Sequence, residues 1–264
     1  LPVAMMAPAS DDDAPVSLPA EELRQPLRLS LLLWLLGLPG VVGMAWQVGQ
    51  RLPSGHLPGW ALPVMGSVQS LLLLAAAVFF GAWLSPRVGL GAPMLGSLVQ
   101  RRGRPVTALQ QMWLPGVAGG VMGAAWMVTL AQLTPDALAP GDPVQALPLW
   151  IKLLYSGVAE ELLVRWGMMS VMLFGLWRML QPRGGAPRSG LVWMVIALAA
   201  LLGAASNLPA AMALMGGLSP ELLAYVLLNH TVFGLLAGYI YWRHGLGAAI
   251  VAHTLALALS HGLT

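Results

Sequence analysis

The chain of 264 residues contains no cysteine and few charged residues. Without cysteine, disulfide bonds and thiolate chemistry are excluded. Only 9% of the residues are Asp, Glu, Lys or Arg, whereas soluble domains carry roughly 25%. A soluble surface must be solvated even when the core is large, so the shortage of charge excludes a soluble domain.

Apolar residues make up 58% of the chain and gather in long continuous runs. Continuous runs favour membrane-spanning helices over the alternating strands of a β-barrel. The sequence therefore predicts an all-α polytopic membrane protein, a bundle of about seven to eight transmembrane helices with a polar cavity inside the membrane. The expected spans are 28–49, 60–84, 113–134, 148–178, 190–216, 221–242 and 246–262. The shorter apolar stretch 88–100 is expected to be re-entrant or interfacial, and the last span is short.

The arginines predict an orientation. If the seven spans alternate, one side receives Arg24, Arg28, Arg87, Arg101, Arg102, Arg104, Arg178, Arg183, Arg188 and Arg243. Only Arg51 falls on the other side, together with the loop 135–147, which has no Lys or Arg. The positive-inside rule then places the N-terminus in the cytoplasm of a multi-pass protein of the cell inner (plasma) membrane. The net charge of +3 indicates basic loops at a lipid bilayer, with no nucleic-acid partner.

Glycines at a spacing of four residues predict close helix packing. The third span contains Gly116, Gly119, Gly120 and Gly123, and the sixth contains Gly234 and Gly238. Small residues at this spacing let neighbouring helices approach each other. We interpret these glycines as packing residues without a chemical role.

Several polar residues interrupt the apolar runs, where ionisable groups are costly and usually face a bundle interior or a wet cavity. They are Glu160, Glu161 and Arg165 in the fourth span, Asn207 in the fifth, Asn229 and His230 in the sixth, and His253 in the last. Each residue taken alone is compatible with a structural ion pair or an interhelical hydrogen bond. Glu160, Asn207 and His253 lie on faces of small residues of separate helices, so together they predict one shared site.

The two adjacent glutamates are expected to have different roles. Glu161 and Arg165 are four residues apart, so they can pair on one helix face. Glu160 is rotated from Glu161 by about 100° around the helix and is left facing the small-residue cavity. A carboxylate in that position could act as a general base.

Three motifs resemble the CPBP family of CAAX-protease and bacteriocin-processing (abortive-infection) intramembrane proteins. EELLVR at 160–165 fits the family's EExxxR motif, and GLLAGYIYWRHGLGAAIVAH at 234–253 resembles its last motif region. LLGAASNLPA at 201–210 is similar to the middle segment, which usually reads FGxxH followed by Leu-Pro. The resemblance covers about 148–262 and implies a glutamic intramembrane endopeptidase that acts on a membrane protein or peptide.

The resemblance also implies residue roles. Glu160 would be the general base on water, His253 would assist it, and Glu161 and Arg165 would support the first motif. The chain departs from the pattern: Asn207 replaces the second-motif histidine, Gly203 the phenylalanine before it, and Leu257 the asparagine after the last histidine. His230, with Asn229 beside it, is the auxiliary candidate that could compensate. These departures leave open that this form is inactive.

The predicted division of the chain follows the resemblance. Residues 1–26 form an N-terminal cytoplasmic arm, 27–147 form scaffold helices, and 148–264 form the CPBP-like catalytic core. We expect no cofactor, with zinc bound by Glu160, His230 and His253 as a weaker alternative, since no HExxH motif is present.

Two other functions stay open. One is a non-catalytic relative that binds or stabilises a membrane-protein partner, which the motif departures favour. The other is a small proton-coupled transporter, although the chain lacks the internal repeat that many transporters show.

Overall fold

The computed structural model describes residues 20–51, 58–99, 105–134, 147–181, 185–261 and 263. These parts of the chain are helical and contain no strand, so the predicted all-α membrane fold is confirmed. The helices are α1 Ala20–Arg51, α2 Ala61–Leu84, η2 Ser85–Val88, α3 Pro93–Val99, α4 Pro105–Leu133, α5 Leu149–Ile151, η4 Lys152–Ala159, η5 Glu161–Met169, α6 Ser170–Leu180, α7 Ser189–Ala205, α8 Leu208–Met215, α9 Pro220–His244 and α10 Leu246–His261.

Six helical segments in the described ranges are long and apolar enough to cross a membrane. They correspond to the first six predicted spans, and α5, η4, η5 and α6 together form the fourth. The seventh, α10, has 16 residues, which extend about 24 Å at 1.5 Å per residue. It is therefore shorter than the roughly 30 Å hydrocarbon core, as its sequence suggested.

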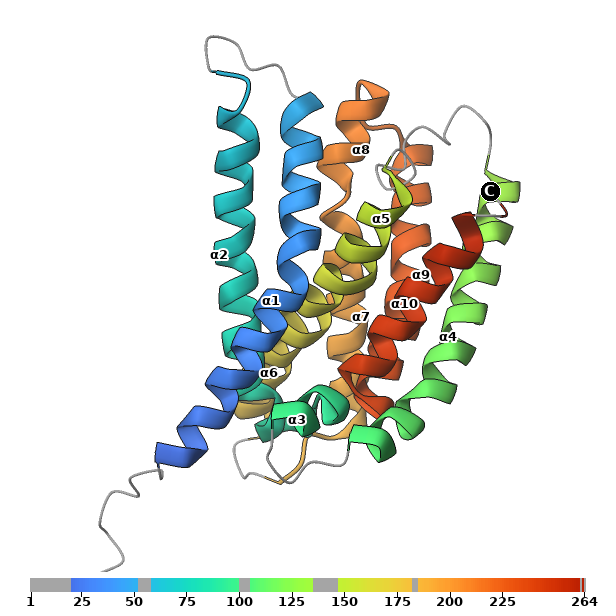
Figure 1. The fold of residues 1–264 in the computed structure, drawn as a ribbon. Helices are drawn as coiled ribbons and strands as arrows, with labels where there is room; N and C mark the ends of the chain where they lie inside the picture. Colours follow the sequence, from blue (N-terminus) through green and yellow to red (C-terminus); the bar gives the residue numbers. More distant parts are fainter. Residues whose placement is uncertain are drawn as a thin grey trace, which may run out of the picture.

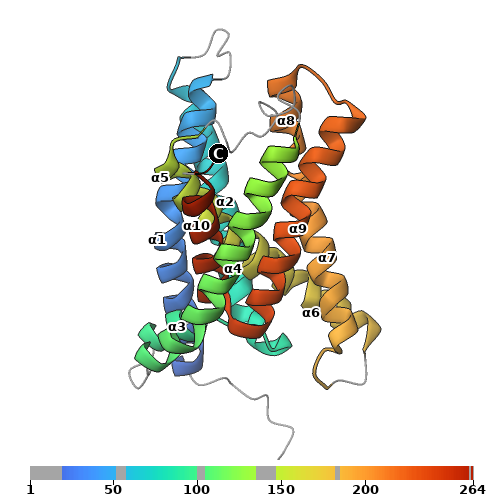
Figure 2. The same ribbon diagram turned by 90° about the vertical axis from the view of Figure 1, so that its right-hand side faces the viewer.

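The long helices run side by side and alternate in direction (Figures 1 and 2). One end of the bundle carries the start of α1, η2, α3, the α6–α7 connection and the α9–α10 turn (Figure 1). We call it the arginine end, because it bears the exposed residues Arg28, Arg87, Arg178, Arg188 and Arg243. The other end, where α4 and α10 finish and α8 lies, is called the opposite end.

The apolar stretch 88–100 does not form a further span. It contains only the seven-residue helix α3, which lies across the direction of the long helices at the arginine end (Figure 1). The carbonyl of Gly91, just before α3, accepts a hydrogen bond from the N–H of Leu246 at the start of α10 (3.0 Å). The short helix across the end of the bundle is compatible with the expected interfacial position, and the choice between an interfacial and a re-entrant segment stays a prediction.

The fifth span is broken beside its asparagine. Helix α7 ends at Ala205 and α8 begins at Leu208, with Pro209 at the start of α8. Proline has no N–H, so it cannot continue the hydrogen-bond ladder to the carbonyl of Ala205. The break places Asn207 at a helix junction rather than in a continuous helix.

The glycine-rich face of α4 packs closely, as predicted, and its partner, which was not predicted, is α10. A Cβ atom added at Gly116 would lie 2.9 Å from Val251 Cβ, and one added at Gly120 would lie 2.7 Å from Leu255 Cβ. Both distances are too short for a side chain, so the two backbones meet only because these residues are glycine. This contact fixes the position of α10, which carries His253.

The predicted arm and domain division stay largely outside the described residues. Residues 1–19 are not described, and residues 20–26 form the first turns of α1. Arg101, Arg102, Arg104, Arg183 and most of the loop 135–147 also lie outside the described ranges. The boundaries between arm, scaffold and core therefore stay predictions.

Candidate active site

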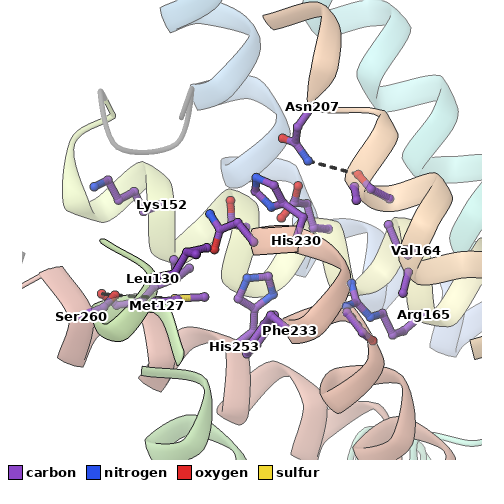
Figure 3. A pocket seen from close by; sticks show the side chains of 18 of the residues that line it. Met127, Leu130, Lys152, Val164, Arg165, Asn207, His230, Phe233, His253 and Ser260 are labelled. Carbon is purple, nitrogen blue, oxygen red and sulfur yellow. Dashed lines mark hydrogen bonds between the residues drawn. The ribbon is translucent and has the colours of Figure 1, made fainter. Parts of the chain in front are cut away.

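A pocket between the fourth span, α4, α7, α9 and α10 gathers most of the predicted polar residues (Figure 3). It offers about 80 Å³ of space to the centres of water molecules. Since one water needs roughly 10–15 Å³ by this measure, several waters fit. The residues of the predicted site that line it are Glu160, Arg165, Asn207, Asn229, His230 and His253.

Glu161 lies behind the pocket wall at the centre of a buried polar cluster. Its carboxylate is fully buried, and its Oε1 atom lies 3.3 Å from Nη1 of Arg165 and 2.7 Å from Nδ1 of His253. The pairing of Glu161 with Arg165, expected from their spacing, is therefore present. The contact with His253 was not predicted.

Arg165 extends the cluster to a third helix. Its Nη2 atom donates a hydrogen bond to the carbonyl of Gly234 in α9 (3.4 Å). A Cβ atom at Gly234 would lie 2.8 Å from Ala200 Cβ, so glycine here also lets α9 approach α7. Arg165 therefore neutralises Glu161 and ties the fourth span to α9.

The contact with Glu161 determines which atom of His253 can act in the pocket. An ionised carboxylate only accepts hydrogen bonds, so we assign the proton to Nδ1, which donates to Glu161. The Nε2 atom is then left for the pocket. The His253 ring also contacts the Phe233 ring, with 4.4 Å between centroids, and these two contacts hold the imidazole in one orientation.

A glycine in the fourth span makes the carboxylate–imidazole contact possible. A Cβ atom at Gly157 would lie 2.6 Å from Oγ1 of Thr254, the neighbour of His253. The faces around His253 are lined by small residues, including the fully buried Ala249 and Ala256. Close packing of η4 on α10 therefore brings Glu161 within reach of His253.

Glu160 occupies a different environment from Glu161. It is half-buried and lines the pocket, whereas Glu161 is not part of the pocket wall. The expected geometry, with one glutamate facing the cavity and the other paired with arginine, agrees with this arrangement. Whether Glu160 acts as a base stays a prediction.

The backbone around Glu160 is a π-helix, which was not predicted. The segments Lys152–Ala159 and Glu161–Met169 are both π-helical, and the N–H of Glu160 bonds to the carbonyl of Tyr155, five residues earlier. Wide helical turns of this kind are rare and frequently occur at functional sites. The sequence pattern alone predicts an ordinary α-helix here.

Asn207 faces the pocket and is anchored to its own helix. Its Nδ2 atom donates to the carbonyl of Gly203 (3.1 Å), as the dashed line in Figure 3 shows. One amide hydrogen is therefore used locally, while the carbonyl oxygen and the second amide hydrogen stay available. An asparagine can donate a hydrogen bond here but is a poor proton carrier.

The auxiliary candidates His230 and Asn229 both reach the pocket from α9. In Figure 3 the imidazole of His230 lies between Asn207 and His253. The carbonyl of Asn229 accepts a hydrogen bond from Trp126 in α4 (3.3 Å). His230 and Asn207 therefore line the same pocket, and a compensating role of His230 stays a prediction.

Two further residues of the pocket wall bear on its chemistry. Lys152 is buried and lines the pocket, and it was not predicted as a site residue. Its spacing of eight residues, about two helical turns from Glu160, was the available signal. Leu257 also lines the pocket, so the position of the family's asparagine is apolar.

The zinc alternative has no ligand set in the described part of the chain. Across those residues, no group of three His, Asp or Glu side chains is arranged to hold a metal ion. Glu160, His230 and His253 share the pocket without forming such a group. The expectation that no cofactor is needed stays untested.

The fold and the pocket define a polytopic helical membrane protein with a buried carboxylate–imidazole cluster. Residues 142–259 match the family model described as type II CAAX prenyl endopeptidase Rce1-like. This segment contains Glu160, Asn207 and His253, and the match confirms the resemblance to the CPBP family and supports a protease of the CAAX type. No curated protein and no solved structure matches the chain.

Proposed function

We propose that this protein is an intramembrane endopeptidase that hydrolyses a peptide bond of a membrane-associated protein or peptide with a glutamate-activated water. The observation that carries the proposal is that Glu160 and His253 line one pocket that can hold several waters, with His253 held by the buried Glu161. A carboxylate and an oriented imidazole around a water site are the groups that general-base hydrolysis requires.

In the proposed reaction, Glu160 removes a proton from a pocket water as the water oxygen attacks the scissile carbonyl carbon. The carbonyl oxygen becomes an oxyanion, which accepts a hydrogen bond from the free amide hydrogen of Asn207. The Nε2 atom of His253 accepts a hydrogen bond from the attacking water and so positions it. Glu160, now a carboxylic acid, returns the proton to the leaving amide nitrogen. The C–N bond breaks, and Glu160 is regenerated as a carboxylate.

Arg165 and Glu161 act as positioning residues in this scheme. Glu161 fixes the direction of His253, and Arg165 holds Glu161 in place through their contact of 3.3 Å. His230, with Asn229 beside it, supports the water in place of the histidine that the family carries at position 207. The chain needs no metal for these steps.

A second candidate function is binding without catalysis. Two observations favour it: Leu257 puts an apolar side chain where the family has an oxyanion-stabilising asparagine, and one amide hydrogen of Asn207 is already bonded to Gly203. Such a protein would bind a membrane-protein partner in the pocket and stabilise it. A cleavage assay distinguishes the two functions, because only the protease would cut the bound protein.

We also propose that the arginine end faces the cytoplasm, so that the N-terminus is cytoplasmic in the inner (plasma) membrane. The support is the concentration of exposed arginines at that end, which positive-inside topology places on the cytoplasmic side.

The test is cleavage of a library of membrane-proximal peptides in proteoliposomes, scored by mass spectrometry. Glu160→Gln is expected to lower kcat by about 10²–10⁴-fold, the usual contribution of a general base, with an unchanged melting temperature. Glu221→Gln is the matched control, because Glu221 is exposed at the start of α9, outside the pocket, and it should cleave normally. Asn207→His should cleave faster than the unchanged chain.

Two outcomes would contradict the proposal. Equal cleavage by Glu160→Gln and the unchanged chain would place the base elsewhere. If neither the unchanged chain nor Asn207→His cleaves while both bind a common membrane protein, the non-catalytic function is the correct one.

A further inference from the structure

The pocket lies in one half of the bundle. Its α4 residues fall between Met127 and Ala131, close to the end of α4 at Leu133, and its first fourth-span residue is Lys152, close to the start at Leu149. In α10 the lining residues begin at His253 and run to His261, the last residue of the helix. These three helix ends all lie at the opposite end of the bundle (Figure 1).

Helices α9 and α7 also line the pocket with their parts nearer the opposite end. The α9 residues of the pocket lie between Tyr225 and Gly234, in the part of α9 nearer its start. The α7 residues lie in its last turns and continue to Asn207. All five elements therefore line the pocket with the part that points toward the opposite end.

The pocket also reaches the surface there. Ala131 and His261 are exposed and belong to the pocket wall. Glu160 lies eleven residues after the start of the fourth span at Leu149. The half-buried Glu160 therefore lies inside the fourth span, in a pocket whose exposed wall residues are at the opposite end.

The arginine end has the features of a cytoplasmic membrane interface. Three arginines stack on tryptophans there: Arg87 on Trp83 (4.7 Å), Arg178 on Trp177 (5.7 Å) and Arg243 on Trp242 (5.6 Å). Tryptophan gathers at the headgroup level. Arginine is enriched on the cytoplasmic side, where anionic lipids attract it.

From these two placements we infer that the pocket is entered from the non-cytoplasmic face of the membrane. The inference rests on the proposed function for its chemical consequence: the substrate is a segment of a membrane-anchored protein at or just below the non-cytoplasmic surface. A cytoplasmic chain terminus would meet the arginine end, and none of the described pocket residues belongs to that end.

Cysteine accessibility tests the entry side directly, because the chain contains no cysteine of its own. Leu257→Cys reports the pocket, and Leu218→Cys reports the opposite end, where Leu218 is 49% exposed between α8 and α9. Ala186→Cys, at an exposed residue between α6 and α7, reports the arginine end. The probe is a small, charged methanethiosulfonate that does not cross membranes, applied to intact cells and to inverted vesicles.

We expect Leu257→Cys and Leu218→Cys to be labelled in intact cells. Ala186→Cys should be labelled only in inverted vesicles. Labelling of Leu257→Cys only in inverted vesicles, together with Ala186→Cys, would overturn the inference. Protection of Leu257→Cys from both faces would also overturn it, since the pocket would then have no aqueous entrance.

Labelling does not depend on catalysis, so the inference and the proposed function can fail separately. The same labelling pattern is expected in Glu160→Gln. If Leu257→Cys is labelled from outside but the protein never cleaves, the inferred entry side stands and the proposed protease function is wrong. Conversely, if inverted vesicles cleave an added peptide and right-side-out vesicles do not, the protease function stands and the pocket is entered from the cytoplasmic face.

Discussion

Two consecutive glutamates in one span lie in different surroundings. Glu161 is fully buried and contacts both Arg165 and His253 through one carboxylate oxygen. Glu160, the preceding residue, lines the pocket. Adjacent residues point in different directions around a helix, so the pair EE gives one carboxylate to the structure and one to the cavity.

Replacing Glu161 by glutamine should separate its structural effect from its effect on His253. Glu161→Gln leaves Arg165 as a buried charge without its partner, and breaking such a pair costs about 3–5 kcal/mol. We expect a lower melting temperature and a lower kcat, measured by tryptophan fluorescence on heating and by peptide cleavage.

The double variant Glu161→Gln/Arg165→Met identifies the positioning role. Removing both charges of a buried pair is often nearly neutral, so the melting temperature should recover in part. The kcat should stay low, because His253 still lacks its carboxylate. Recovery of both quantities would mean that Glu161 only stabilises the fold.

The residue-scale pattern was only partly predictable from the sequence. The i,i+4 spacing of Glu161 and Arg165 predicted their pairing, because it depends on one helix alone. The Glu161–His253 contact joins residues 92 positions apart and depends on where α10 packs. No local pattern contains that information.

At the scale of elements, α1 packs against the backbone of the π-helix. A Cβ atom added at Gly40 would collide with the backbone carbonyl of Leu154, within η4. Backbone atoms cannot rotate away as a side chain can, so this glycine sets the distance between α1 and η4. The position of Glu160, at the end of η4, depends on that distance.

Gly40→Ala is therefore expected to lower stability by about 1–3 kcal/mol, the usual cost of overpacking, and to lower cleavage by shifting η4. Gly175→Ala is the matched control, because a Cβ atom at Gly175 in α6 meets nothing within 4 Å. Alanine favours helix over glycine by up to about 1 kcal/mol, so the control should melt at the same or a higher temperature. Equal melting temperatures for Gly40→Ala and Gly175→Ala would mean that α1 moves freely away from η4.

The elements differ in how well the sequence predicted them. Apolar runs located the spans, because that signal is local. The break between α7 and α8 beside Pro209 was not predicted, since the apolar run 190–216 continues through it. The π-helical turns of η4 and η5 were not predicted. They require hydrogen bonds between residues five apart, and the apolar pattern of LWIKLLYSG suits an α-helix equally well.

At the scale of the whole molecule, the segment that matches the Rce1-like family does not contain all of its own packing partners. The match covers residues 142–259, whereas α1 and α4 precede it. Yet α4 packs along α10 through Gly116 and Gly120, and α1 packs on η4 through Gly40. The helices that carry Glu160 and His253 are thus held from outside the matched segment.

A chain cut between residues 147 and 148 tests this dependence. We expect the 148–264 fragment alone to show no cooperative unfolding in detergent, because the faces of α10 and η4 that meet α4 and α1 would be left without partners. Co-expressed with the 1–147 fragment, it should form a complex that purifies together and cleaves peptides when Glu160 is intact. Its stability should fall with dilution, since the two parts no longer share one chain and their effective concentration is lost. If the 148–264 fragment unfolds cooperatively and cleaves alone, the first half is dispensable for the site, and the glycine contacts with α1 and α4 only add stability to a core that is already folded.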